Sequence, residues 1–344
     1  MKTLRKYFVF NVLLLSILTV FNSGCEKEKN KEIILYLTTA PTKSITETSA
    51  ISGGEIWEDV SSSVLTRGVC WSSNPNPTIA NNKTNDGSGT GIFESHLTGL
   101  SANSTYYIRA YATNNEGTAY GDELTLKTIG PVTDVDGNVY QTISIGNQVW
   151  MTQNLKTTKY RNGNPIQLIS DINQLGGLTT GAYCDYDNNS SNSNTYGRLY
   201  NWYSLIDQRN ICPIGWHIPS KDEWEILFNY LGGKSVAGGK LKETGTAHWI
   251  SPNEGATNES GFKALPGGSV IVGIDNYSNY YAYFDMQIGS SASFWSSTSG
   301  PSTHPTNPTY IAYFFELSSY HAEVVQQSRF MYYLGAYSIR CIRD

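Results

Sequence analysis

The sequence predicts a mainly β protein with two globular parts: a β-sandwich over residues 33–128, and a second domain of short strands, long loops and very little helix over residues 131–344. Three observations support this prediction. The chain contains 24 Tyr, 8 Trp and 32 Gly, which favour strands and turns rather than helices. Its first part alternates short apolar runs with turn residues. Its second part contains one clear amphipathic helix.

The charge and hydropathy of the chain exclude two classes of function. The 344 residues carry 24 Lys+Arg against 29 Asp+Glu, a formal net charge of −5, whereas proteins that bind nucleic acid need basic faces. The hydrophobic fraction is 39%, and only one apolar run approaches the length of a membrane span. We therefore expect neither a nucleic-acid partner nor a membrane-spanning fold.

Residues 1–24 have the pattern of a signal peptide. A basic segment, residues 1–6, precedes an apolar segment, residues 7–21, which is interrupted by Asn11, Ser16 and Thr19. The apolar segment is short for a bilayer span and normal for a signal peptide. The sequence therefore predicts export from the cytoplasm.

Small residues lead up to Cys25, and this arrangement resembles a bacterial lipobox. The resemblance implies that diacylglycerol is attached to Cys25, which becomes the N-terminus after cleavage. The charged residues 26–32 form a tether that resembles the acidic export signals of surface lipoproteins of the Bacteroidetes type. We expect an outer-membrane protein, exposed at the cell surface and attached to the membrane through its lipid anchor only. The alternative is an ordinary signal peptide followed by an incidental cysteine.

Residues 33–128 show the spacing of a β-sandwich. Leu100 precedes Tyr106 by six positions, which resembles the tyrosine corner of fibronectin type III domains. Period-2 alternation after Tyr106 places Tyr111 on the outward face. We expect a spacer role for this part and a buried free thiol at Cys70. The expected strands are residues 33–39, 45–57, 64–72, 91–98, 105–114 and 119–128.

The second part contains one helix with clear boundaries, expected over residues 221–231. Ser220 is placed as its N-cap, and Glu223 completes a capping box. An apolar stripe then continues to residue 231, and a pair of glycines at 232–233 ends the helix. The stripe consists of Trp224, Leu227, Phe228 and Leu231.

The second part also carries a series of short motifs in a fixed order. Together they resemble the domain named the Fibrobacter succinogenes major paralogous domain, over residues 131–344. The resemblance implies a secreted or surface protein and brings no defined chemistry. The motifs include Ile145-Gly-Asn-Gln-Val-Trp150, Tyr196-Gly-Arg-Leu-Tyr-Asn-Trp202, Cys212-Pro-Ile-Gly-Trp216-His-Ile-Pro-Ser220, Gly255-Ala-Thr-Asn258-Glu259-Ser-Gly261-Phe262, Phe294-Trp295-Ser-Ser-Thr298 and Ser338-Ile-Arg340-Cys341-Ile-Arg-Asp344.

The same domain is similar to the C-type lectin-like fold, an α+β fold with long loops and a terminal strand. In that fold a disulfide ties the beginning of the domain core to the last strand. The resemblance implies a bond between Cys212 and Cys341, which the periplasm or cell surface permits, and leaves Cys184 unpaired. Pairing of Cys184 with Cys212 or Cys341 stays open, since three cysteines allow three single bridges.

The sequence does not predict a zinc site or an enzyme. The five His residues are scattered and lack metal-ligand spacing. No Gly-x-Ser-x-Gly motif occurs. Formylglycine-generating enzymes, which share the C-type lectin-like fold, use two nearby cysteines in their C-terminal region, where this chain has only Cys341. We therefore expect a protein without enzymatic activity or an obligatory cofactor.

The polar loop 251–260 is the strongest candidate for a calcium site. Its Pro, Asn and Glu residues are similar to the loops with which calcium-dependent lectins hold sugar hydroxyls, although their order differs. A structural loop and a direct sugar contact are the alternatives. The candidate calcium ligands are Asn253, Glu254, Asn258 and Glu259.

Tyrosine is concentrated near the C-terminus, and tyrosine supplies rigid contact area at low entropy cost. We expect residues 131–344 to bind an extracellular glycan or protein, so that the chain acts as an adhesin. The alternative is a non-catalytic structural component of the envelope or of a fimbria-like assembly. Exposed aromatic side chains gathered on one face would favour binding. The candidate contacts are Asn258, Glu259, Tyr280, Tyr281 and Trp295, of which Trp295 can equally belong to the core.

Overall fold

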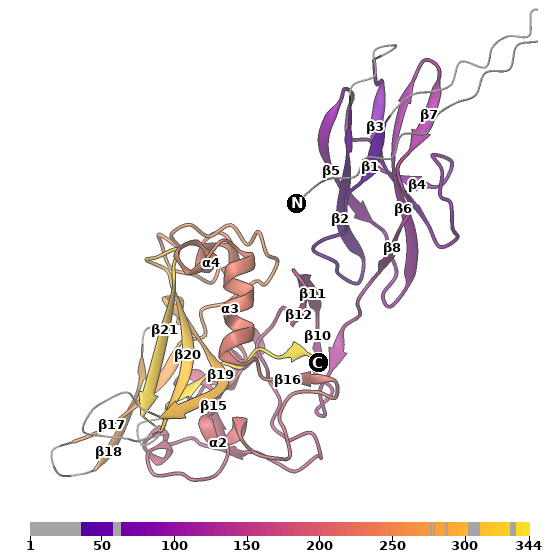
Figure 1. Cartoon of the computed structure of the whole chain (residues 1–344). Coiled ribbons are helices and arrows are strands. Elements are labelled where there is room, and N and C mark those ends of the chain that lie inside the picture. Colours follow the sequence, from indigo (N-terminus) through magenta and orange to yellow (C-terminus); the bar gives the residue numbers. More distant parts are fainter. Residues whose placement is uncertain are drawn as a thin grey trace, which may run out of the picture.

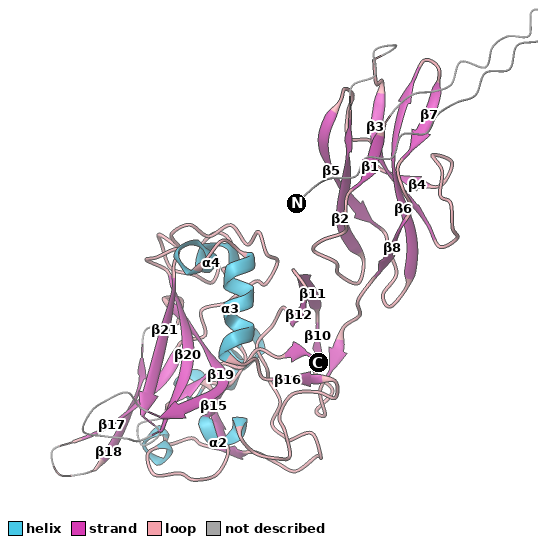
Figure 2. Cartoon of the chain, viewed as in Figure 1, coloured by secondary structure: helices cyan, strands magenta, loops and turns pink. Residues whose placement is uncertain are grey.

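The computed structural model describes residues 36–57, 63–275, 277, 279–285, 288–301, 310–330 and 335–344. The expected signal peptide, Cys25 and the charged tether lie outside these residues. Within them strands dominate and helices are short, so the chain is mainly β, as predicted (Figure 2). Among the described helices, none has the length and apolar character that crossing a membrane requires.

The first part consists of two antiparallel sheets that share one apolar core (Figure 1). One sheet has the order β1-β2-β5; the other has the order β4-β3-β6-β7, with β8 also paired to β6. Leu97 of the first sheet and Ile108 of the second are fully buried between them. The strands are β1 (Leu37–Thr39), β2 (Ser49–Ile56), β3 (Thr66–Ser72), β4 (Asn82–Lys83), β5 (Gly91–Thr98), β6 (Thr105–Asn114), β7 (Gly117–Tyr120) and β8 (Leu124–Lys127).

Strand β6 departs from the predicted alternation at Tyr111. This side chain was expected to face outward, but it is buried, and its hydroxyl donates a hydrogen bond to Thr84 O at 2.6 Å. The segment after β4 therefore covers the outer face of β6 at this point. The Tyr106 hydroxyl accepts a hydrogen bond from Ser101 N at 3.0 Å, which ties this side chain to the backbone five positions earlier. Cys70 is a buried free cysteine, as predicted.

The described residues of the second part form three sheets and a short hairpin, β9-β10. The sheets have the orders β13-β14-β15-β22-β17-β18, β19-β20-β21 and β11-β12-β23-β16. The last two strands, β22 and β23, thus lie between strands from earlier in the chain, so the C-terminal segment completes both sheets. The strands are β9 (Val132–Thr133), β10 (Val139–Tyr140), β11 (Thr142–Ile145), β12 (Gln148–Met151), β13 (Gln167–Leu168), β14 (Ala182–Cys184), β15 (Leu199–Asn201), β16 (Trp216–His217), β17 (Ser269–Ile274), β18 (Tyr280–Asp285), β19 (Ser291–Pro301), β20 (Tyr310–Ser318), β21 (Val324–Phe330), β22 (Ala336–Tyr337) and β23 (Ile342–Arg343).

The predicted helix is present as α3 (Lys221–Tyr230), and its capping box between Ser220 and Glu223 is complete. Trp224 of this helix is buried, with its ring centroid 4.8 Å from that of Trp150 on β12. Two glycines with positive φ end α3, and a helix that the sequence analysis did not predict, α4 (Lys234–Leu241), follows them. The remaining helices are η1 (Ile172–Leu175), η2 (Tyr186–Asn188), α1 (Ser190–Tyr196) and α2 (Trp202–Leu205).

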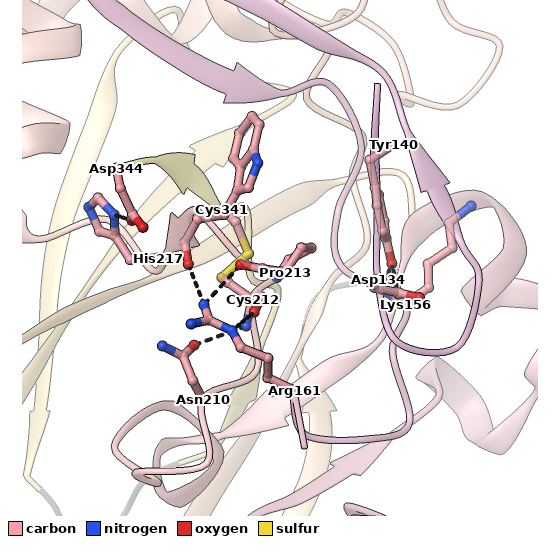
Figure 3. The surroundings of a disulfide bond; sticks show 11 residues. Asp134, Tyr140, Lys156, Arg161, Asn210, Cys212, Pro213, His217, Cys341 and Asp344 are labelled. Carbon is pink, nitrogen blue, oxygen red and sulfur yellow. Dashed lines mark hydrogen bonds and ion pairs between the residues drawn. A yellow bond between two sulfur atoms is a disulfide. The ribbon is translucent and has the colours of Figure 1, made fainter. Parts of the chain in front are cut away.

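Cys212 and Cys341 form the predicted disulfide (Figure 3). Their Cα atoms are 6.1 Å apart, and 129 positions separate them in the sequence. Both lie in the apolar core beside β16 and β23. Cys184 is a buried free cysteine on β14, so the alternative pairings are wrong.

Hydrogen bonds between Ile45 and Ser144 join the first part to the second. Ile45 N donates to Ser144 Oγ at 2.7 Å, and Ser144 N donates to Ile45 O at 2.9 Å. Ser144 lies on β11, an outer strand of its sheet. The segment before β2 therefore satisfies part of an edge that would otherwise be open.

Candidate ligand-binding surface

The β17–β18 hairpin carries exposed tyrosines at the end of the second part that lies away from the first part (Figure 1). Its turn is organised by Asp275, whose carboxylate accepts hydrogen bonds from Tyr277 N and Asn279 N, each at 2.8 Å. Asp275 N in turn donates to Asn279 O at 2.9 Å. Tyr277 lies in this turn and is 86% exposed.

Tyr281 and Tyr283 form a pair on one face of β18, which we call the tyrosine platform. They are two positions apart on a strand, so both side chains point to the same side of the sheet. Their ring planes are 13° from parallel, their centroids are 6.4 Å apart, and the residues are 48% and 47% exposed. The Tyr281 ring reaches over Gly273 of β17, where a Cβ atom would lie 2.5 Å from the ring. Only glycine at position 273 leaves this space to the ring.

Tyr280 belongs to the opposite face of β18. Its ring packs over Gly176, where a Cβ atom would lie 2.3 Å from the Tyr280 Cβ atom. The next residues of the same face, Ala282 and Phe284, pack against the apolar core. Tyr280 and Tyr281 therefore do not form one contact surface, contrary to the expectation from the sequence, and Tyr283 takes the place of Tyr280 beside Tyr281.

Trp295 is a core residue, and its candidate role as a ligand contact is wrong. Its side chain is fully buried on β19, and its Nε1 donates to Tyr200 O at 2.7 Å. The rings of Trp202 and Tyr337 lie against it, with centroid distances of 5.6 Å and 4.5 Å. A ligand cannot reach this ring without opening the domain.

The polar candidates Asn258 and Glu259 lie on the loop 251–260, which packs against α4 through a bond from Thr257 N to Gly239 O at 2.9 Å. In Figure 1, α4 lies at the other end of the domain from β17 and β18. The structure therefore does not bring these residues to the tyrosine platform. Asn258 Oδ1 accepts from Lys263 N at 2.9 Å.

Among the candidate calcium ligands, the side-chain oxygens of Asn258 and Glu259 have partners within the protein, whereas Asn253 uses its amide nitrogen and its Oδ1 has no partner among the described residues. Asn253 donates from Nδ2 to two backbone carbonyls of the segment 243–245, at 2.9 Å and 2.7 Å. Glu259 lies 3.4 Å from Lys240 Nζ. Within the part of the chain that the structure describes, no group of three or more His, Cys, Asp or Glu is placed to hold a metal ion.

A lysine ammonium group lies where the loop 251–260 meets the rest of the domain. Lys242 is fully buried, and its Nζ donates to Glu254 O, Ser318 O and His321 O at 2.8, 2.8 and 2.9 Å. It also lies 5.4 Å from the centre of the Trp249 ring. Burial lowers the pKa of Lys242 to about 8, while the nearby Glu254 carboxylate acts to raise it. Backbone carbonyls are ligands that a bound cation would use, and here a side chain of the protein occupies them.

Two features of the second part were not predicted from the sequence. The pairing of Tyr281 with Tyr283 has a local signal, because residues two apart on a strand share a face. The burial of Lys242 has none, because a lysine after an apolar helical residue normally lies in solvent.

Comparison with known proteins gives one family. Residues 143–343 match the family model described as the Fibrobacter succinogenes major domain. No curated protein matches the chain significantly. Two solved structures of the sensor domain of the anti-sigma factor RsgI4 of Pseudobacteroides cellulosolvens match 28% of this chain, at 20% and 19% identity and a TM-score of 0.22 each. The match covers 76% of the solution structure and 95% of a shorter form of that domain, and a TM-score this low carries no argument about fold or function. The family model spans more than half of the chain, which therefore belongs to the Fibrobacter succinogenes major domain family.

Proposed function

We propose that the chain is a non-catalytic surface lipoprotein that binds an extracellular glycan or protein through the tyrosine platform of its second part. The observation that carries the proposal is the pair of half-exposed, nearly parallel rings of Tyr281 and Tyr283. Most exposed tyrosines of a folded domain lie singly, whereas rings held parallel at this spacing offer a flat apolar surface with hydroxyl groups at its edge.

The hairpin geometry favours binding because it fixes the rings before any ligand arrives. Asp275 organises the turn, and the Tyr281 ring rests on the backbone at Gly273. A preformed aromatic surface loses little side-chain entropy on binding. The position of the hairpin, away from the first part, suits a role in which residues 36–128 act as a spacer (Figure 1).

We further propose a fibronectin type III-like sandwich for residues 33–128 and a C-type lectin-like fold for residues 131–344. The strand order β1-β2-β5 opposite β4-β3-β6-β7 and the bond from Ser101 N to the Tyr106 hydroxyl support the first. The disulfide from Cys212 to Cys341, next to the last strand, supports the second.

The double substitution Tyr281→Ala and Tyr283→Ala is expected to weaken ligand binding by roughly ten- to hundredfold, because each ring supplies contact energy typical of an aromatic binding residue. A glycan array followed by an extracellular-matrix protein panel, with the chain from residue 26 onward, identifies the ligand and then measures the loss. Tyr320→Ala is the matched control, since Tyr320 is 55% exposed but lies in the β20–β21 turn. Binding should survive a calcium chelator. Equal binding by the double variant and the control would overturn the proposal.

We also propose that Cys25, which lies outside the described residues, anchors the protein to the outer membrane through attached lipid. The small residues before this cysteine and the charged tether after it support the proposal. Cys25→Ala is expected to move the protein from the membrane fraction to the soluble fraction of fractionated cells. The Cys70→Ala variant, which changes a buried thiol, should stay with the membrane. Unchanged detergent partitioning of Cys25→Ala would argue for another mode of attachment.

A further inference from the structure

A cleft of about 270 Å³ lies beside the disulfide, between the turn at residues 133–135 and the loop at residues 211–214. It is separate from the tyrosine platform and shares no residue with it. Its walls combine apolar side chains with one basic and one acidic group. The lining residues are Thr133, Asp134, Val135, Arg161, Ile211, Cys212, Pro213 and Ile214.

The turn that forms one wall is held by Asp134. Its Oδ1 accepts hydrogen bonds from Asp136 N and Asn138 N, both at 2.9 Å. Its Oδ2 accepts from Asn138 Nδ2 at 2.9 Å and from the Tyr140 hydroxyl at 2.6 Å. Each carboxylate oxygen therefore already has two donors, so Asp134 shapes the wall but offers a ligand no free acceptor.

The opposite wall is held by Arg161 and by the disulfide (Figure 3). Arg161 Nε donates to Cys212 O at 2.9 Å, and Nη2 donates to Pro213 O and Trp216 O, each at 2.8 Å. Three carbonyls of one loop are thus tied to one guanidinium group, while Cys212 itself is bonded to Cys341. The wall is fixed without help from a ligand.

This rigid loop presents an apolar side chain to solvent at the edge of the cleft. Trp216 N donates to Pro213 O at 3.1 Å, and Gly215 has a φ of +78°, which is the geometry of a turn that needs glycine at its third position. Ile214 occupies the second position of this turn and is 82% exposed. Val135, on the facing turn, is also exposed. The cleft therefore has an apolar rim on both sides.

Arg161 supplies a positive charge to the cleft and forms no ion pair with a described carboxylate, although Asp134 lines the same cleft. Among the described residues its guanidinium group donates only to backbone carbonyls, and no carboxylate oxygen lies at ion-pair distance from it. Its Nη1 group has no hydrogen-bond partner among the described residues. A guanidinium next to apolar rim residues is complementary to an organic anion.

We propose that this cleft binds a monocarboxylate attached to a small apolar body, with Arg161 contacting the carboxylate and Ile214 contacting the body. The volume accommodates one sugar ring or one amino-acid residue rather than a whole polymer. The charge of Asp134 in the same cleft opposes a doubly charged anion such as phosphate. The C-terminal residue of a peptide with a small apolar side chain presents the required chemistry, whereas the ring of a uronic acid carries hydroxyl groups in place of an apolar body.

The proposal is tested by titrating the oxidised chain from residue 26 onward, in a calorimeter, with five probes. N-acetyl-L-alanine is compared with its neutral amide, D-glucuronate is compared with neutral D-glucose, and inorganic phosphate is the fifth probe. We expect N-acetyl-L-alanine to bind more than tenfold more tightly than its amide and more tightly than D-glucuronate. Preferential binding of inorganic phosphate or of D-glucuronate, or equal binding of N-acetyl-L-alanine and its amide, overturns the proposal.

The variant Ile214→Asp places a negative charge at the rim and should weaken binding of the carboxylate probe at least tenfold. Ile214 is exposed, so this change leaves the fold intact. Ile206→Asp is the matched control, because Ile206 is also exposed and does not line the cleft. Arg161→Gln should abolish binding, and its melting curve shows whether the loop still folds. Unchanged binding by Ile214→Asp overturns the proposal, whatever the result for the tyrosine platform.

Discussion

Removal of the Cys212–Cys341 disulfide is expected to lower the free energy of unfolding by roughly 4–5 kcal/mol. The bond joins two cysteines that are 129 positions apart in the sequence. In the chain-entropy model a cross-link over such a length removes about this much freedom from the unfolded chain. The folded domain also depends on the bond locally, because Cys341 precedes β23, which lies between β12 and β16. Urea unfolding of Cys212→Ala/Cys341→Ala, followed by tryptophan fluorescence, measures the loss.

The double variant removes buried sulfur atoms as well as a cross-link, and Cys184→Ala separates the two effects. Cys184 is a fully buried free cysteine, so its substitution costs only the packing of one sulfur, about 1–2 kcal/mol. Reduction of the wild type should reproduce most of the loss seen in the double variant. A double variant no less stable than Cys184→Ala would show that the cross-link contributes nothing.

The helix α3 could be predicted because its signals are local. Ser220 and Glu223 satisfy each other's backbone groups within one turn, and the spacing of the apolar residues defines the buried face. The disulfide is different, because spacing alone allowed three pairings and a family resemblance selected the correct one. Neither prediction required knowledge of how distant strands pair.

The tyrosine platform could be predicted only in part, because strand alternation does not say which face is covered. It places Tyr281 and Tyr283 together, yet Tyr280, which is still 36% exposed, packs on the opposite face against Gly176, more than a hundred positions away. Trp295 is covered by Trp202 and Tyr337, which also come from distant strands and helices. A local pattern identifies candidate contacts, and long-range packing decides which of them stay exposed.

The burial of charged side chains could not be predicted from the sequence either, because it also depends on long-range packing. Arg340 is fully buried, and its Nε and Nη2 donate to Asn154 Oδ1, 186 positions earlier, at 3.1 Å and 2.6 Å. The guanidinium carbon of Arg340 lies 4.2 Å from the centroid of the Phe262 ring. Burial lowers the pKa of Arg340 to about 9. A residue of this type in an alternating sequence is normally assigned to the surface, and only the assembled sheets show that it is enclosed.

The substitution Lys242→Met is expected to lower the free energy of unfolding by about 2–4 kcal/mol. Methionine fills the space of the lysine stem but donates no hydrogen bond. The carbonyls of Glu254, Ser318 and His321 would then lose the donor they share, at distances of 2.8–2.9 Å. Loss of the ammonium also ends the cost of burying a charge, which is why the expected loss is smaller than three separate hydrogen bonds would give.

The neighbouring lysine provides the matched control. Lys240 lies two positions earlier on α4, and its Nζ pairs with the exposed Glu259 at 3.4 Å. Such exposed pairs contribute at most about 1 kcal/mol, so Lys240→Met should be nearly neutral. Equal losses of unfolding free energy in Lys240→Met and Lys242→Met would show that the buried hydrogen bonds of Lys242 contribute no more to stability than the exposed ion pair of Lys240.

The pH dependence of the Lys242 effect has a defined sign. Burial lowers the pKa of this group in the folded chain to about 8, from 10.5 for an unperturbed lysine. Between these values the unfolded chain binds more protons than the folded chain, so the contribution of Lys242 to stability rises as the pH increases from about 8. The Lys242→Met variant has no titrating group at this position and therefore lacks this pH-dependent contribution. The difference in unfolding free energy between wild type and Lys242→Met should therefore widen between pH 7.5 and about 9.5. A difference that narrows over the same interval would mean that the three carbonyls favour the charged ammonium strongly enough to overcome its burial.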